Sequence, residues 1–194
     1  MNSRKLILER VRANQPAPTA LPTVPPFGNA PADPWATFAA ALARMGGQVV
    51  EGGANLGEWL RERFPTARVV VSATPELTGT RALPPASAPG ALEDVDVGVV
   101  RAAFGVAETG SVWLSEREYG VNALGFLPQH LVVLLDPTAI VPDLHAAYGY
   151  TGFFEARYAA LMTGPSATAD IEGILIRGAQ GIRSLTVVAC TVSG

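Results

Sequence analysis

The chain has 194 residues, of which 48% are hydrophobic and 16% charged, so it can build one sizeable core and little more. The formal net charge of -3 argues against a protein that binds the phosphate backbone of a nucleic acid. No apolar run approaches the roughly 20 residues that cross a bilayer. The single cysteine, Cys190, excludes an internal disulfide and an iron–sulfur cluster held by this chain alone.

The first 12 residues predict a short amphipathic helix and not a secretory signal. Glu9 and Arg10 stand where a signal peptide would have its apolar region. Leu6, Ile7 and Val11 form an apolar side, so we expect this helix to dock on the main domain, with binding to a partner as the alternative. With no signal, no membrane span and no paired cysteines, the sequence favours a cytoplasmic location.

A proline-rich segment follows this helix. Residues 15–34 contain seven prolines, which disfavour helix and strand and predict an extended connector. A polyproline ligand for an aromatic groove is the less favoured alternative. We therefore divide the chain into a helix and connector, residues 1–34, and one domain, residues 35–194.

From residue 35 onward, helical and strand patterns alternate. Asp33 is expected to cap a helix that starts at Pro34 and ends at Gly46 and Gly47, and Asn55 to cap a second helix. A largely helical pattern also covers residues 142–158. Strands are expected at 48–50, 69–71, 95–100, 112–114, 131–135, 161–163 and 185–189. This alternation predicts an α/β domain with a mostly parallel sheet and helices on both faces.

Two polar loops are candidates for a ligand site, since open α/β sheets bind ligands beyond the carboxyl ends of their strands. The first loop is residues 107–111, Ala-Glu-Thr-Gly-Ser, and the second is residues 163–173. In the second loop, Ser166 or Thr168 would cap a following helix, whose N-terminus could hold an anion. Asp170 and Glu172 would complement the dipole of that helix.

These loops resemble the LUD-domain family, and within it the lactate utilisation protein C group. The resemblance rests on residues 107–111 (AETGS), on Leu127-Pro128 with His130, and on residues 164–172 (GPSATADIE). Gly178, Gly181 and Arg183 follow in the pattern G-x-x-G-x-R. The match is densest over residues 97–189 and looser over residues 35–72.

The resemblance implies a fold similar to that of sugar-phosphate isomerases and coenzyme A transferases. It also implies a role beside two companion proteins that oxidise L-lactate to pyruvate, one of which carries ferredoxin-type cysteine motifs. This chain lacks those motifs, so any electrons would travel through an iron–sulfur partner. The chain itself would bind a small carboxylic acid or brace that partner.

Two side chains are candidates for acid/base chemistry. Glu108 could serve as a base or, by analogy with coenzyme A transferases, as a nucleophile, or it could brace its loop by accepting backbone N–H groups. His130 could move the proton of a 2-hydroxy acid, or it could be a hydrogen-bonded structural histidine.

The remaining candidates would contact the ligand. Arg183 is the expected cation for a carboxylate, although it could equally pair with Asp170. The full set of expected ligand contacts is Thr109, Gly110, Ser111, Gly164, Ser166, Thr168, Asp170, Glu172 and Arg183.

No cofactor is indicated by the sequence. It contains no dinucleotide, P-loop or zinc-protease motif, and we expect no bound metal. Lys5 is the only lysine, which excludes Schiff-base chemistry in the core.

Two functions follow. The first is a subunit without redox centres in a lactate-oxidising system. The alternative is a stand-alone enzyme acting on a small organic acid, a sugar phosphate or an acyl-coenzyme A, with Glu108 and His130 as its acid/base pair. The alternative requires these two side chains to face one cavity.

Overall fold

The computed structural model describes residues 3–25, 30–52, 55–85, 88–170 and 172–191. Within these ranges, no helix combines the length and apolar character that crossing a membrane requires. The α-helices are α1 (Ser3–Ala13), α2 (Pro34–Arg44), α3 (Leu56–Arg63), α4 (Glu116–Tyr119), α5 (Leu144–Tyr148) and α6 (Gly152–Glu155). Two single turns of 3₁₀ helix are η1 (Pro89–Leu92) and η2 (Asn122–Gly125).

A five-stranded parallel sheet forms the centre of the domain. In spatial order its strands are β1 (Gln48–Val50), β11 (Ser184–Ala189), β6 (His130–Leu135), β3 (Val97–Arg101) and β2 (Val70–Ser72). The expected mostly parallel α/β architecture is therefore confirmed. Short, nearly continuous apolar runs suit these strands, because a parallel sheet is covered on both faces and so buries the side chains on both sides of each strand.

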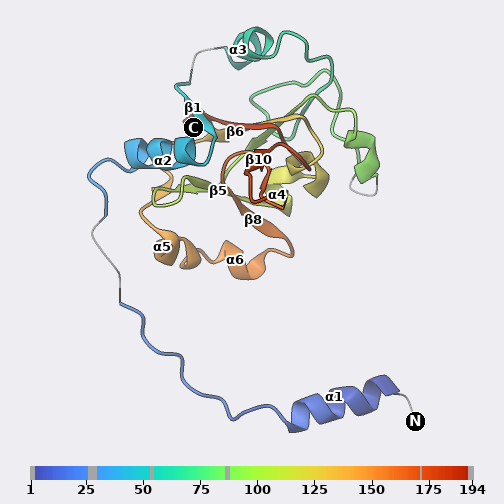
Figure 1. The fold of residues 1–194 in the computed structure, drawn as a ribbon, viewed down its shortest axis with the longest axis vertical. Helices are drawn as coiled ribbons and strands as arrows, with labels where there is room; N and C mark the ends of the chain where they lie inside the picture. The colour runs from blue at the N-terminus through green and yellow to red at the C-terminus, as the bar shows by residue number, and fades with distance from the viewer. Residues whose placement is uncertain (1–2, 26–29, 53–54, 86–87, 171, 192–194) are drawn as a thin grey trace.

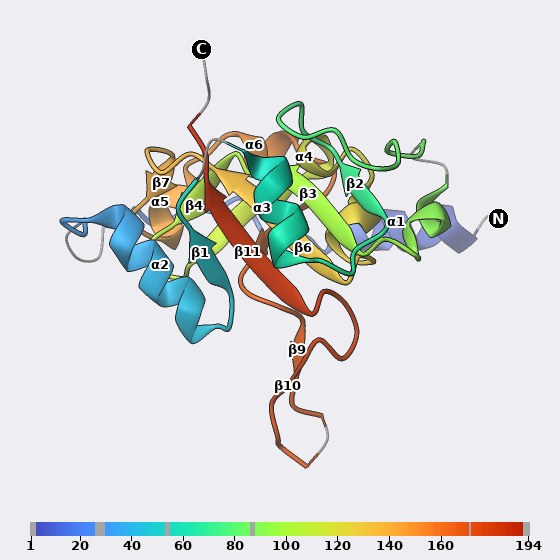
Figure 2. The same ribbon diagram turned by 90° about the horizontal axis from the view of Figure 1, so that it is seen from above.

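A second, mixed sheet lies beside the first. In spatial order its strands are β7 (Ile140–Val141), β4 (Phe104–Val106), β5 (Ser111–Ser115) and β8 (Ala159–Met162). The pairs β4–β5 and β5–β8 are antiparallel. The strands β9 (Ala167–Thr168) and β10 (Ile176–Arg177) pair with each other, and Figure 2 shows this two-stranded arm projecting from the domain.

Side chains alternate between the faces of these sheets and so divide the core. In β6, Leu131, Val133 and Leu135 join the cluster that includes Phe38 and Leu42 of α2. The intervening residues, Val132 and Leu134, pack instead with Leu60 of α3 and with Phe64, which follows that helix. Figure 1 shows the resulting order of layers, from α3 through the parallel sheet and the second sheet to α5 and α6.

The N-caps of the two long helices of the domain are those expected from the sequence. Asp33 accepts a hydrogen bond from the backbone N–H of Ala36 at 2.9 Å. Asn55 accepts one from the N–H of Glu58 at 3.0 Å. The expected helical stretch at 142–158 is divided into α5 and α6, because the chain turns between Gly149 and Thr151.

The expected docking of the N-terminal helix is wrong. No residue of α1 is buried, and the side chain of Ile7 is 59% exposed. Figure 1 shows α1 apart from the domain, at the far end of the connector. Residues 26–29 of the connector lie outside the described residues. The division of the chain after residue 34 stays a prediction.

Candidate functional site

The AETGS segment forms the tight turn that joins β4 to β5, and not a loop that enters a helix. Gly110 adopts a φ of +69°, and its N–H donates to the carbonyl of Val106 at 2.9 Å. A Cβ at this position would lie only 2.6 Å from the Cα of Leu42 in α2. Glycine therefore allows the turn to press directly against the backbone of α2.

Three hydroxyl groups form a hydrogen-bonded chain behind this turn. The Oγ1 of Thr109 lies 2.7 Å from the Oγ of Ser111, and Ser111 also hydrogen-bonds to the Oγ1 of Thr163. Ser111 begins β5 and Thr163 follows β8, so the antiparallel pairing of these strands brings the two hydroxyls together. Ser111 is buried, whereas Thr109 and Thr163 are half-buried.

These hydroxyls line a cavity of about 420 Å³ between α2, the β4–β5 turn and the end of β8. Arg44, in the last turn of α2, brings a cation to the cavity. Within the described part of the chain, no ion pair occupies that guanidinium. The lining residues are Ala41, Arg44, Met45, Glu108, Thr109, Ser111, Leu144, Leu161 and Thr163. One cation, linked hydroxyls and an apolar wall can bind a small hydroxy acid.

Glu108 lines the cavity but also supports the surrounding loops. One carboxylate oxygen accepts the N–H of Leu144, the first residue of α5, at 3.0 Å. Its own N–H donates to the carbonyl of Pro142 at 3.1 Å. The side chain is exposed. This geometry agrees with the loop-bracing alternative, and a carboxylate at the rim also repels a ligand with a second negative charge.

His130 lies outside this cavity. It opens β6, its Nδ1 lies 2.8 Å from the Oγ of Ser184, and its ring packs on Phe64 at 4.7 Å between centroids. Burial lowers the pKa of the imidazole below its ordinary value, and the charges of Arg63 and Arg183 lower it further. The structure thus does not bring Glu108 and His130 together there, and it does not support the acid/base pair of the stand-alone enzyme.

The helix that was expected to follow an N-cap at Ser166 or Thr168 does not form in the described residues. Thr168 instead pairs with Ile176 across the arm, and Glu172 and Gly173 have φ values of 55° and 72°. Among the described residues of this stretch, the pairing of β9 with β10 takes the place of the helix, so they offer no helix N-terminus for an anion. Ile171 lies outside the described residues. On the arm, the Oγ1 of Thr168 donates to the carboxylate of Asp170 at 2.7 Å.

Gly164 and Ser166 line a neighbouring cavity of about 200 Å³, and Thr163 lines both cavities. Gly164 has a φ of +70°, and a Cβ there would lie 2.6 Å from the carbonyl oxygen of Met45. The N–H of Ser166 donates to the carbonyl of Ile182 at 3.0 Å. These two predicted residues are therefore adjacent to the candidate site and not part of its lining.

Arg183 lines neither cavity. Its backbone N–H donates to the carbonyl of Gln129 at 2.7 Å, its side chain is exposed, and no ion pair joins it to Asp170. The structure places Arg44 at the cavity instead. Sequence patterns offer little signal for Arg44 as a ligand contact, because a cation in the last turn of a helix ordinarily complements the helix dipole.

No metal centre is visible in the described part of the chain, which contains no cluster of three or more histidine, cysteine, aspartate or glutamate side chains suited to a metal ion. The candidate site is therefore a cavity built from hydroxyls, one cation and one carboxylate.

Comparisons with known proteins agree with this architecture. A solved structure of a DUF162 family protein from Deinococcus radiodurans shares the fold, with a TM-score of 0.62, 20% identity, and coverage of 81% of this chain and 96% of that one. Two curated relatives are both named lactate utilization protein C. The one from Geobacillus thermodenitrificans is 28% identical over 107 residues, and the one from another Geobacillus strain is 29% identical over 105 residues.

These matches cover 52% and 51% of this chain, and the chain spans only 45% and 44% of the length of the two relatives. The model of the LUD domain matches residues 90–190. This segment contains the AETGS turn, the strands β5, β6 and β8, the arm and β11. It amounts to just over half of the sequence, and the chain therefore belongs to the LUD-domain family.

Proposed function

We propose that the chain serves in lactate utilisation as a component without redox centres, in a cytoplasmic system that oxidises L-lactate to pyruvate. The observation that carries this proposal is the cavity at the AETGS turn, where a guanidinium and three linked hydroxyls line one space. The name of the two Geobacillus relatives supports lactate as the substrate of the system.

L-Lactate matches the chemistry of this cavity group by group. Its carboxylate would pair with Arg44, and its 2-hydroxyl would join the hydrogen-bonded chain that ends at Thr109. Its methyl group would face Leu144 or Leu161. The rim carboxylate of Glu108 favours a monocarboxylate over a dicarboxylate, because like charges repel.

The proposed partner is an iron–sulfur protein. The chain's one thiol, on Cys190, is half-buried and lies 3.2 Å from a guanidinium nitrogen of Arg101. One cysteine cannot hold a cluster, so electrons removed from lactate would pass to another protein. The cavity is also larger than lactate requires, and this leaves room for a side chain of that partner.

Titration of the purified chain with L-lactate tests the binding half of the proposal. Arg44→Gln removes the cation and should weaken binding about fivefold, the value of one exposed ion pair. Arg183→Gln makes the same charge change outside the cavity and should leave the affinity unchanged. If Arg183→Gln weakens binding and Arg44→Gln does not, the carboxylate binds elsewhere and the assignment of the cavity is wrong.

A second experiment tests the partner. The tagged chain is recovered from its native cells grown on L-lactate, and the copurifying proteins are identified. The proposal predicts a protein with ferredoxin-type cysteine motifs and lactate-oxidising activity. Recovery of the chain alone across gentle salt conditions would contradict the role as a subunit.

A further inference from the structure

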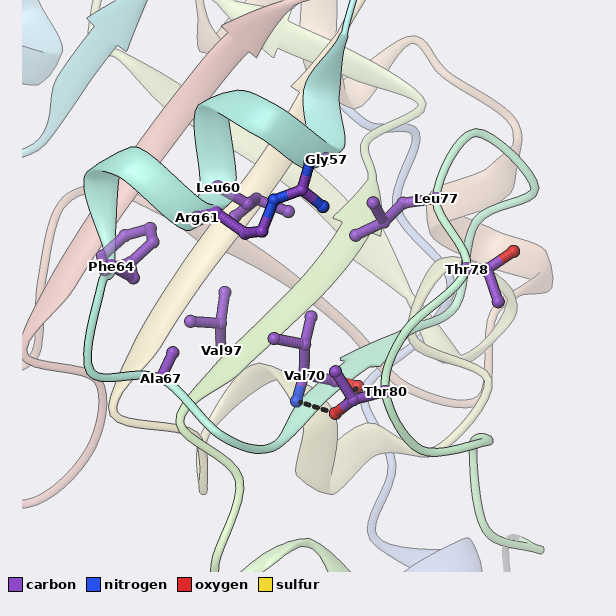
Figure 3. Close-up of a pocket in the computed structure, with 10 residues that line it drawn as sticks. All are labelled: Gly57, Leu60, Arg61, Phe64, Ala67, Val70, Leu77, Thr78, Thr80 and Val97. Atoms are coloured by element: carbon purple, nitrogen blue, oxygen red, sulfur yellow. Dashed lines mark hydrogen bonds between the residues drawn. The ribbon is translucent and has the colours of Figure 1, made fainter.

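A separate cavity of about 260 Å³ lies under α3, on the other face of the central sheet from α2. Leu60 of α3 and Phe64, the residue that follows this helix, form one wall, and Val70 and Val97 form the floor. Figure 3 shows Leu77 turning into this space from the opposite side. The complete lining is Gly57, Leu60, Arg61, Phe64, Ala67, Val70, Leu77, Thr78, Thr80 and Val97.

The wall opposite α3 is a segment, residues 77–81, that is fixed to the edge of the sheet. The hydroxyl of Thr80 accepts the N–H of Val70 at 2.9 Å and contacts the carbonyl of Arg68 at 3.1 Å. Glycine at position 79 permits this approach, because a Cβ there would lie 2.5 Å from the carbonyl oxygen of Val70.

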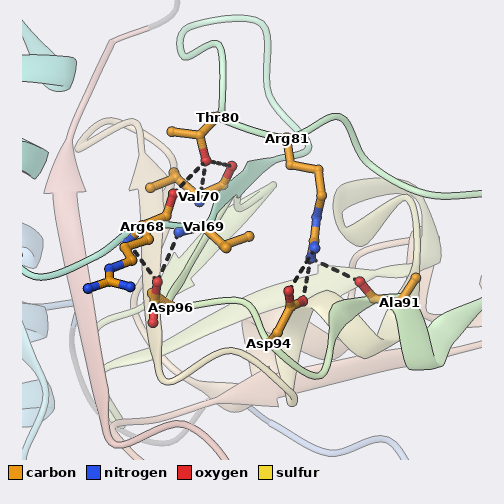
Figure 4. Close-up of polar contacts among 8 residues, drawn as sticks. All are labelled: Arg68, Val69, Val70, Thr80, Arg81, Ala91, Asp94 and Asp96. Atoms are coloured by element: carbon orange, nitrogen blue, oxygen red, sulfur yellow. Dashed lines mark hydrogen bonds and ion pairs between the residues drawn. The ribbon is translucent and has the colours of Figure 1, made fainter.

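Arg81 fixes the end of the same segment. Its two terminal nitrogens donate to the carboxylate of Asp94 at 3.0 and 2.7 Å, and one also donates to the carbonyl of Ala91 at 2.9 Å. Figure 4 shows these contacts beside those of Asp96, which accepts the N–H groups of Arg68 and Val69. The cavity is thus bounded by ordered backbone on both sides, as a preformed ligand site requires.

Arg61 is the one charged residue among the described residues that line this cavity. Arg61 is exposed, so its guanidinium lies at the open side of the cavity, and Figure 3 shows it beside Gly57 with Leu77 opposite. No ion pair within the described ranges involves it, and Glu58 and Glu62 of the same helix are not in the lining. The site therefore combines an apolar interior with one cation at its entrance.

We propose that this cavity binds an apolar monocarboxylic acid, with the carboxylate at Arg61 and the hydrocarbon between α3 and residues 77–80. Its size suits one ring with a short chain, since a cavity of roughly 150 Å³ already accommodates benzene. L-Lactate has too little apolar surface to fill it, so this site is independent of the one at the AETGS turn.

The apolar side chains of α1 are the other candidate occupant within the chain, and charge disfavours them. The helix carries Arg4, Lys5, Arg10 and Arg12, so its entry would bring further cations to Arg61. A carboxylate, in contrast, complements that guanidinium.

Titration with 3-phenylpropionate tests the proposal, with methyl signals of the full chain followed by NMR. Saturable shifts are expected at Leu60, Val70, Leu77 and Val97. The neutral analogue 3-phenylpropanol should bind about fivefold more weakly, because it lacks the ion pair. Saturable shifts confined to other residues, or none up to solubility, would overturn the proposal.

Variants then separate the cation from the apolar interior. Arg61→Gln should abolish the preference for the acid, while Arg68→Gln, an equal charge change outside the lining, should keep it. Ala67→Phe should fill the cavity and remove binding of both probes, and Leu77→Trp provides a second filling variant if Ala67→Phe does not fold. Persistence of the preference in Arg61→Gln, or of binding in a folded filled variant, would refute the site.

Discussion

Gly110→Ala tests whether the AETGS turn and α2 are built as one unit. A residue with a side chain at a φ of +69° loses about 1–2 kcal/mol in the left-handed region. The new Cβ would also lie 2.6 Å from the Cα of Leu42 and 2.8 Å from the carbonyl carbon of Ala41, so the helix or the turn must move. Overpacking of this kind costs about 1–3 kcal/mol.

The two contributions together predict a loss of about 3 kcal/mol in the free energy of unfolding, or about 9 °C in Tm for a chain of this length. Gly173→Ala is the matched control, because Gly173 has a φ of 72° but no atom within 4 Å of a Cβ. That variant should lose only about 1 kcal/mol.

Urea unfolding followed by tryptophan fluorescence measures both losses. The contact with α2 accounts for the expected difference of about 2 kcal/mol between the variants. Equal losses in the two variants would refute a contribution from the contact with α2, since backbone strain alone would then explain the loss of stability in Gly110→Ala. A second readout is L-lactate affinity, which Gly110→Ala should reduce because Arg44 moves with α2.

Three further predictions follow from the fold. Asp33→Ala should cost about 1 kcal/mol in urea unfolding through loss of the α2 cap, and an unchanged midpoint would contradict this. The pKa of His130 is lowered in the folded chain, so the unfolded chain binds a proton more readily as the pH falls towards about 6.5. The free energy of unfolding should therefore decrease as the pH is lowered from about 7.5 to 5.5. His130→Gln should flatten this dependence, whereas His145→Gln should not. Removal of residues 1–32 should leave the urea midpoint unchanged, because α1 buries nothing, and a loss above about 0.5 kcal/mol would show that α1 contacts the domain.

Local signals explain the parts of the fold that were predictable. Asp33 and Asn55 act within a single helical turn, so their capping could be predicted without knowledge of the tertiary structure. The strand at Leu131–Leu135 was equally clear, since five consecutive apolar residues suit a parallel strand buried on both faces.

The arm could not be predicted because its determinants are not local. Ser166 and Thr168 are residue types that cap helices, but hydroxyl side chains also serve in turns and strands. The choice was decided by the pairing of Thr168 with Ile176 and by the left-handed conformations at Glu172 and Gly173. Neither the strand pairing nor the left-handed backbone at these two residues can be recognised from the local sequence around Ser166 and Thr168.

The candidate site was predictable on one side only. The turn residues Glu108, Thr109 and Ser111 do line the cavity, whereas the sequence pattern points to Arg183 as the cation and the structure places Arg44 there. Arg44 reaches the cavity because α2 packs on Gly110, a contact between distant parts of the sequence.

This arrangement divides the cavity between two parts of the chain. The hydroxyls and Glu108 lie within residues 90–190, which the LUD-domain model covers, but Arg44 lies before that segment. In this chain, the segment that the LUD-domain model covers thus provides the hydroxyls, and the preceding helix provides the guanidinium. A family member that keeps the hydroxyl turn but lacks a cation on this helix is expected to bind a neutral ligand. Asp33 caps that helix, so a domain cut to begin at residue 35 would lose the cap of the element that carries Arg44, and we propose residue 33 as its first residue.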